Sequence, residues 1–138
     1  MKQKEPGKSY SHVGKPERIC ALITGATSGI GRATAEVFAA NGINLILCGR
    51  RQDRLAELKK KLESQTKVHL LNFDVRDKEA VFKSISSLPP TFSQVGILIN
   101  NAGNAHGMDT IQNGDPEDWD AMLNINVKGL LYVSKAVM

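Results

Sequence analysis

Residues 24–31, with the sequence TGATSGIG, constrain the fold of this chain more than any other stretch. They follow a short apolar run, residues 19–23, and open an amphipathic run that includes Val37 and Phe38. A strand, a glycine-rich turn and a helix form the context in which such a motif binds a dinucleotide. Glycine permits the tight turn and a close approach of the backbone to a ligand. The first turn of the helix favours an anion, and we expect that anion to be a pyrophosphate.

The spacing of the motif leaves two interpretations open. The spacing is Gly-x-x-x-Gly-x-Gly, through Gly25, Gly29 and Gly31, and its first gap is wider than that of the common Gly-x-Gly-x-x-Gly. Taken alone, this spacing also fits a glycine-rich turn with no ligand. The rest of the chain must decide between them.

Length and composition indicate one globular domain. The chain has 138 residues, of which 41% are hydrophobic, which is enough for a core. No apolar run is long enough to cross a membrane, and the N-terminus lacks the apolar centre of a signal peptide, so we expect a cytoplasmic protein. Cys20 and Cys48 lie in apolar runs, which predicts buried thiols rather than a disulfide.

Most of the net charge of +4 lies near the N-terminus. We expect residues 1–17 to form a flexible basic tail and residues 18–138 to form the domain. The tail has no interleaved aromatic side chains of the kind that nucleic-acid-binding segments use, so we expect no nucleic-acid partner. No spacing of ligand residues indicates a metal site.

Apolar runs and helical patterns alternate along residues 18–138. The apolar runs are short and apolar on both faces, which predicts a parallel sheet covered by helices on both sides. This is an α/β fold, a Rossmann-type doubly wound sheet in three αβα layers, for which we expect the strand order 3-2-1-4. The expected strands are residues 18–24, 43–48, 67–73 and 96–100, and the expected helices are residues 29–41, 52–63, 78–88 and 116–138.

The last expected helix has no stop signal. It begins at the Asp115-Pro116 pair and is still amphipathic at Val137, next to the final residue. A doubly wound nucleotide-binding fold usually has two βαβαβ halves, and only one is nearly complete here. We therefore expect a fold truncated after its fourth strand and the helix that follows.

Two arginines follow the second expected strand. An NAD-binding fold of this kind places an acidic residue there to bind the ribose 2′-hydroxyl. This chain has Gly49 at that place, followed by Arg50 and Arg51. Guanidinium groups suit a phosphate, so the pair favours the 2′-phosphate of NADP. The alternative is a solvated start of a helix, although arginines there oppose the helix dipole.

Three further polar positions fit the ligand-binding edge of such a sheet. Asp74 follows the third strand and is placed either to accept a hydrogen bond from an adenine amino group or to cap a turn. Residues 100–103, NNAG, let the backbone pass close to a ligand, although alone they fit any turn. Asn126 falls within the expected apolar face formed by Trp119, Met122, Leu123, Leu130 and Val133, and an amide there needs a partner or a water.

The three motifs together, TGATSGIG, NNAG and the Asn-x-x-Gly at residues 126–129, resemble the short-chain dehydrogenase/reductase family over residues 18–138. The sequences GRRQDRLAELK and LPPTFSQVGILINNAGNAHGMD are similar to those of NADP-dependent 3-hydroxy acid dehydrogenases in that family. The resemblance implies a hydride transfer between NADP and a secondary alcohol or its carbonyl, with a 3-hydroxy acid as the substrate. The alternative is a non-catalytic nucleotide-binding fragment or pseudoenzyme.

The resemblance also implies a role for each motif residue. Arg50 and Arg51 would hold the 2′-phosphate, while Asp74 and Val75 would line the adenine. Asn126 would match the family's asparagine that holds a water in the proton relay. The glycine turn would bind the pyrophosphate and the adenine ribose through Gly25, Ala26, Thr27, Ser28, Gly29, Ile30 and Gly31. The loop after the fourth strand would lie beside the nicotinamide side of the cofactor, through Asn101, Ala102 and Gly103.

One departure from the family pattern limits what this chain is expected to do. The family's catalytic serine and Tyr-x-x-x-Lys have no match, because Tyr132 and Lys135 are three residues apart on a helix already assigned. His106, in a loop with no acidic partner nearby in sequence, is not expected to replace them, and neither are His12 and His69. We expect an enzyme when intact, inactivity for these 138 residues alone, and a homo-oligomer for the intact form, because related enzymes associate through this last helix.

Overall fold

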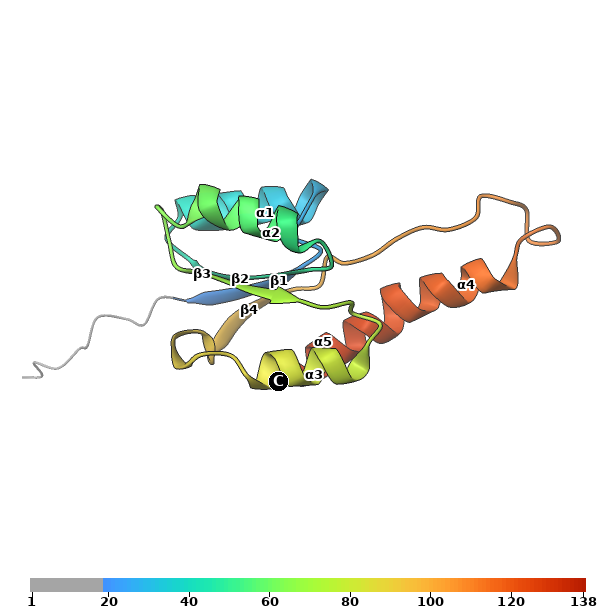
Figure 1. The fold of residues 1–138 in the computed structure, drawn as a ribbon. Helices are drawn as coiled ribbons and strands as arrows, with labels where there is room; N and C mark the ends of the chain where they lie inside the picture. The colour runs from blue at the N-terminus through green and yellow to red at the C-terminus, as the bar shows by residue number, and fades with distance from the viewer. Residues whose placement is uncertain (1–18) are drawn as a thin grey trace, which may run out of the picture.

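The computed structural model describes residues 19–138, in which four parallel strands form one sheet with the order β3-β2-β1-β4. The expected basic tail over residues 1–17 lies outside the described residues. The strand order and the αβα layers confirm the Rossmann-type fold (Figure 1). The strands are β1 Cys20–Thr24, β2 Asn44–Gly49, β3 Val68–Asn72 and β4 Val95–Ile99.

Helices cover both faces of the sheet, as the apolar strands require. The helices α1, Gly29–Ala40, and α2, Gln52–Leu62, lie on one face, while α3, Lys78–Ser86, and α5, Leu130–Val137, lie on the other (Figure 1). Successive side chains of a strand point to opposite faces. Leu22 therefore packs in the core on the α3 and α5 side, and Ile23 packs in the core on the α1 and α2 side.

Two helices begin where the sequence provides a capping residue. Asp77 caps α3 by accepting a hydrogen bond from the Ala80 amide at 3.0 Å, and Asp115 caps α4, Pro116–Leu123, through the Glu117 amide at 3.0 Å. A short 3₁₀ helix, Pro90–Phe92, follows α3 and was not expected. It buries Phe92, which is 8% exposed, under the sheet.

The single helix expected from Pro116 onward was only partly right. Its middle, Asn124–Gly129, is π-helical and joins α4 to α5. The expected apolar face was wrong in part: Val133 is buried as expected, whereas Leu123 and Leu130 are 54% and 40% exposed. A π turn takes in more residues than an α turn, so it shifts which side chains face the sheet. The residues that become buried are Ile125, Gly129 and Val133.

Both cysteines are free and buried, as predicted. Burial raises the pKa of the Cys20 thiol to about 11 and raises the pKa of Cys48 further in the same direction. Because the thiolate is the reactive form, neither side chain should be alkylated in the folded protein. We expect iodoacetamide at pH 8 to modify neither cysteine in buffer and both in denaturant, as measured by mass spectrometry. Rapid labelling of Cys48 in buffer would contradict the burial described here.

Within residues 19–138, no helix has the length and apolar character needed to cross a bilayer.

Candidate functional site

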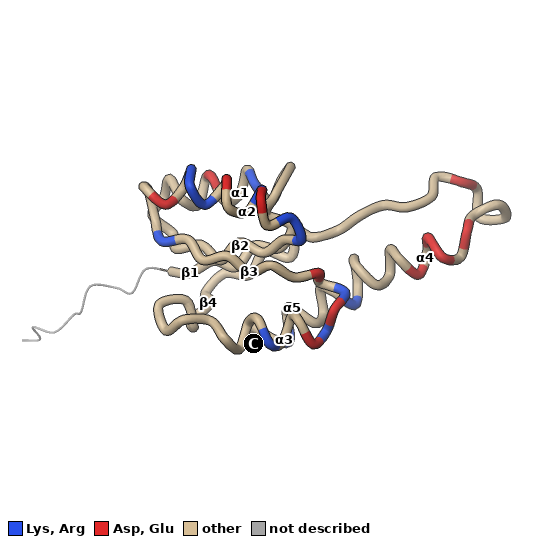
Figure 2. Tube along the Cα trace, in the orientation of Figure 1, with Lys and Arg blue, Asp and Glu red and all other residues tan. Residues whose placement is uncertain are grey.

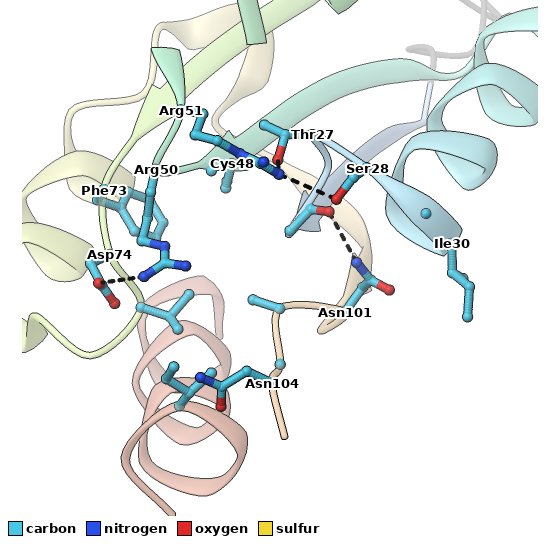
Figure 3. A pocket seen from close by; sticks show the side chains of 17 residues that line it. Thr27, Ser28, Ile30, Cys48, Arg50, Arg51, Phe73, Asp74, Asn101 and Asn104 are labelled. Atoms are coloured by element: carbon cyan, nitrogen blue, oxygen red, sulfur yellow. Dashed lines mark hydrogen bonds and ion pairs between the residues drawn. The ribbon is translucent and has the colours of Figure 1, made fainter. Parts of the chain in front are cut away.

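A cavity of about 440 Å³ opens at the carboxyl ends of the strands (Figure 3). Four segments far apart in the sequence meet there: the glycine turn, the end of β2 with the residues after it, the residues after β3, and the loop after β4. Asn126 does not line the cavity. The lining residues are Gly25, Thr27, Ser28, Gly29, Ile30, Cys48, Gly49, Arg50, Arg51, Phe73, Asp74, Val75, Asn101, Ala102, Gly103, Asn104 and Ile125.

Two residues of the glycine turn do not line the cavity but pack against residues that do. Ala26 is fully buried, and its amide donates to the Cys48 carbonyl at 3.1 Å, which ties the turn to β2. Gly31 is also buried. A Cβ atom there would lie 2.5 Å from the Gly25 carbonyl oxygen and would also contact the side-chain nitrogen of Asn101. Gly31 therefore permits close packing of the start of α1, but it presents no surface to a ligand.

Gly29 has the opposite surroundings. Its φ is +54°, a conformation that glycine adopts without strain, and a Cβ atom there would meet nothing within 4 Å. The space in front of Gly29 belongs to the cavity. Ser28 precedes α1 and its side chain makes no cap, so it leaves the first amide groups of the helix available to another acceptor. This arrangement suits an anion at the helix N-terminus.

The loop after β4 is attached to the glycine turn through Thr24. The Thr24 hydroxyl accepts hydrogen bonds from the Asn101 and Ala102 amides at 3.0 and 2.9 Å. The Asn101 side chain donates to the Thr24 and Gly25 carbonyls, both at 3.1 Å. The sequence suggested that the amides of this motif tie neighbouring loops together, but it gave no partner for them. Thr24 begins the glycine motif, but sequence reasoning did not assign it this role.

Arg50 and Arg51 both line the cavity but have different partners. Arg51 donates to the hydroxyls of Thr27 at 3.0 Å and Ser28 at 3.3 Å, whereas Arg50 lies 3.7 Å from the Asp74 carboxylate (Figure 3). The Arg50 side chain is 64% exposed, so its pair with Asp74 is easily exchanged for another anion. The two guanidinium groups approach the cavity from the end of β2.

Asp74 has one of the two roles that the sequence left open, the capping of a turn. Its carboxylate caps the turn by accepting from the Arg76 amide at 3.0 Å, and it also lines the cavity. The hydrogen bonds from the Arg76 guanidinium, the shortest at 2.7 Å, lower the pKa of Asp74 against the opposing effect of burial. The Asp74 carboxylate is therefore ionised at neutral pH and is a hydrogen-bond acceptor only.

Asn126 is exposed rather than buried in an apolar face, which corrects the sequence-based expectation. Its carboxamide binds both backbone groups of Asn104, accepting from the amide at 3.0 Å and donating to the carbonyl at 2.8 Å. Asn104, another residue that the sequence did not single out, brings this contact to the cavity wall. A Cβ atom at Gly103 would lie 3.1 Å from Asn126 Oδ1, so the loop passes close to the helix.

Gly129 has a similar steric reason for its place in the Asn-x-x-Gly motif. A Cβ atom there would lie 2.7 Å from a methyl group of Val75. The π-helical segment thus approaches the loop after β3, and Val75 lines the cavity. The sequence identified this motif but could not provide its packing partner.

The structure gives His106 an acidic partner, contrary to expectation. Its Nδ1 lies 3.9 Å from an Asp118 carboxylate oxygen, in the first turn of α4. His69 lies in β3 with its ring centroid 5.3 Å from that of Phe92, away from the cavity, and His12 lies outside the described residues. Residues 19–138 contain no group of three side chains of the kind that hold a metal ion.

Comparison with known proteins agrees with this geometry. Sulfoacetaldehyde reductase 2 of Chromohalobacter salexigens is 49% identical over 117 residues, which are 85% of this chain and 46% of that protein. The NADP-dependent 3-hydroxy acid dehydrogenase YdfG of Escherichia coli K12 is 40% identical over 120 residues, 87% of this chain and 48% of that protein. The chain spans about half the length of the curated relatives it matches.

Solved structures agree as well. Serine dehydrogenase from Escherichia coli superposes with a TM-score of 0.79 at 39% identity, covering 86% of this chain and 54% of that one. A closed form of serine dehydrogenase complexed with NADP+ gives a TM-score of 0.80 at 40% identity, covering 87% and 48%. Residues 19–138 match the sequence pattern described as short chain dehydrogenase, and the chain belongs to that family.

Proposed function

We propose that the protein transfers hydride between NADP and a small secondary alcohol or aldehyde that carries an acidic group. The observation that carries this proposal is one cavity in which an open glycine turn, at Gly29, faces two arginines, at Arg50 and Arg51. The turn suits a pyrophosphate and the arginines suit a further phosphate, which together describe NADP rather than NAD.

The residues present fit the cofactor segment by segment. The helix start at residues 28–30 would bind the pyrophosphate, and Arg50 and Arg51 would bind the 2′-phosphate. Asp74 and Val75 would line the adenine, because the ionised carboxylate accepts from an amino group. Asn101, Ala102 and Gly103 would lie along the nicotinamide side. When bound, NADP supplies the hydride acceptor, and the nucleotide itself carries that chemistry.

The role of Asn126 in this proposal is positional. Its side chain fixes the Asn104 backbone and thereby the loop at the nicotinamide end of the cavity. Hydride transfer also needs a positioned acid or base for the hydroxyl proton. These 138 residues contain no Tyr-x-x-x-Lys. The activity is therefore proposed for the whole protein, and we expect the 138 residues alone to be inactive.

The substrate class follows from what the relatives' names have in common. A 3-hydroxy acid carries a carboxylate one carbon away from the carbon that is oxidised, and sulfoacetaldehyde carries a sulfonate one carbon away from its aldehyde. Both are small and have an anionic group next to the CH₂ that flanks the reacting carbon. We therefore include sulfoacetaldehyde beside the 3-hydroxy acids as a proposed substrate.

The test separates cofactor binding from turnover. NADP+ and NAD+ are titrated into the 138-residue chain by calorimetry, and NADP-dependent turnover of sulfoacetaldehyde, 3-hydroxypropionate and serine is measured with the protein as its gene encodes it. We expect NADP+ to bind both the 138-residue chain and the gene product, and we expect only the gene product to turn over a substrate. Absence of NADP+ binding would refute the proposal. Binding without turnover of any substrate by the gene product would favour a non-catalytic nucleotide-binding protein.

We further propose that the whole protein is a cytoplasmic homo-oligomer, with residues 18–138 as part of the dinucleotide-binding domain and residues 1–17 as a basic tail. Large apolar side chains on the outer face of the π-helical segment and α5 support association. Val127, Leu130 and Leu131 are 48%, 40% and 57% exposed. Light scattering of the gene product measures the oligomeric state directly.

A further inference from the structure

A row of four side chains links the π-helical segment to the first turn of α4 through the loop after β4. Asn126 binds both backbone groups of Asn104. The Asn104 carboxamide nitrogen lies 2.6 Å from Nε2 of His106, and Nδ1 of His106 lies 3.9 Å from an oxygen of Asp118. At these distances the imidazole lies between the Asn104 carboxamide on one side and a carboxylate on the other.

A second contact places the same carboxylate against the loop. Gly107 has a φ of +66°, and a Cβ atom there would lie 3.0 Å from Asp118 Oδ2. The backbone thus turns in the left-handed region directly against Asp118, where a larger residue would be strained and crowded. Asp118 therefore contacts two neighbouring residues of the loop, His106 and Gly107.

His106 lies in a part of the chain whose charged side chains are all acidic. Residues 103–127 contain no lysine or arginine, and acidic side chains follow one another along the loop and α4 (Figure 2). His106 is the one basic side chain in this stretch. Its partner at 3.9 Å, Asp118, is the charged group that the described contacts bring to the imidazole.

We propose that His106, anchored by Asp118, is a positioning residue that keeps Asn104 in place against Asn126. An exposed ion pair contributes little to the stability of a whole domain. Residues 100–114 contain no helix or strand, however, and their hydrogen bonds to the sheet and to the last helices come from residues 100–104. A small change in one of their few contacts therefore changes how often the cavity wall opens.

The direct test is hydrogen exchange at the Asn104 amide, measured by NMR on the protein as its gene encodes it. His106→Ala and Asp118→Ala should each speed exchange there about fivefold, while exchange at Leu22 in β1 stays slow and shows that the fold is kept. His106→Gln keeps a polar atom near the Nε2 position and should preserve the slow exchange. Asp120→Ala, the matched control, removes the same charge from α4 and should change nothing.

Two results would overturn this role. One is unchanged exchange at Asn104 in His106→Ala. The other is an equal increase in Asp118→Ala and Asp120→Ala, which would indicate a general effect of helix charge. Both results come from the free protein, so they do not depend on whether the proposed reaction occurs.

The consequence for turnover rests on the proposed function. His106→Ala should lower kcat about tenfold and leave the Kd for NADP+ unchanged, because the adenine side of the cavity is not touched, and His106→Gln should restore kcat. An equal loss of NADP+ affinity would contradict a role confined to the loop. A wild-type protein without turnover would refute the proposed function, and the exchange measurements would still decide the role of His106.

Discussion

Replacing Gly31 with alanine should destabilise the protein by about 2–3 kcal/mol, because the surrounding atoms leave no space for a methyl group. Its Cβ atom would lie 2.5 Å from the Gly25 carbonyl oxygen, which is backbone and cannot rotate away. The start of α1 must then move away from the glycine turn and from Asn101, so the cavity is deformed as well. We expect a lower midpoint in urea denaturation and the loss of NADP+ binding in calorimetric titration.

Gly29 provides the matched comparison, since it lies two residues away in the same turn. A side chain at Gly29 would meet no protein atom within 4 Å, although the φ of +54° imposes about 1 kcal/mol of strain on any other residue. Gly29→Val should therefore remain folded but lose NADP+ affinity, because the valine fills the space proposed for the pyrophosphate. Near-normal affinity in Gly29→Val, or a Gly31→Ala variant as stable as wild type, would contradict this view of the turn.

Removing both arginines after β2 should abolish the preference for NADP+ over NAD+. A hydrogen bond to a charged group contributes about 1.5–3 kcal/mol, which corresponds to about 10- to 150-fold in affinity. We expect the NADP+ affinity of the Arg50→Ala/Arg51→Ala variant to fall at least into that range, and its NAD+ affinity to stay nearly unchanged. Calorimetric titration with both nucleotides measures the ratio.

The single variants and a control refine this result. Arg51 bonds to Thr27 and Ser28, so Arg51→Ala also frees the glycine turn and should weaken NAD+ binding slightly. Arg50→Ala releases only Asp74. Arg54→Ala removes the same charge from α2, but Arg54 does not line this cavity, so it should leave the ratio intact. An unchanged ratio in the double variant would exclude the proposed phosphate site.

Local sequence patterns were sufficient for the fold. The alternation of apolar runs and amphipathic segments, with stop and cap signals at Asn41-Gly42 and Asp77, predicted the elements to within one or two residues. The exceptions are the 3₁₀ helix and the π-helical segment that divides the last expected helix. The strand order 3-2-1-4 is confirmed. Both follow from periodicity and connection rules that act over short stretches of chain.

The supports of the site could not be predicted in the same way. The bonds between Thr24 and Asn101 join residues 77 positions apart, and those between Asn104 and Asn126 join residues 22 apart. Periodicity carries no information about such pairs. Asn126 looked buried because α-helical spacing was assumed across a segment that is π-helical. His106 looked isolated because its partner Asp118 lies a loop away in sequence but adjacent in space.

The π-helical segment also affects how the length of this chain can change in evolution. A π turn accommodates one residue more than an α turn, so deleting one residue from Asn124–Gly129 would restore α-helical spacing without turning α5 against α4. Val133 would then stay in the core, but side chains within the segment would change direction and Asn126 would leave Asn104. Deletions and insertions in the segment should therefore disturb the cavity wall rather than the core. Length variation among natural variants should therefore accumulate in residues 108–114, between the contacts of Gly107 and the cap of α4.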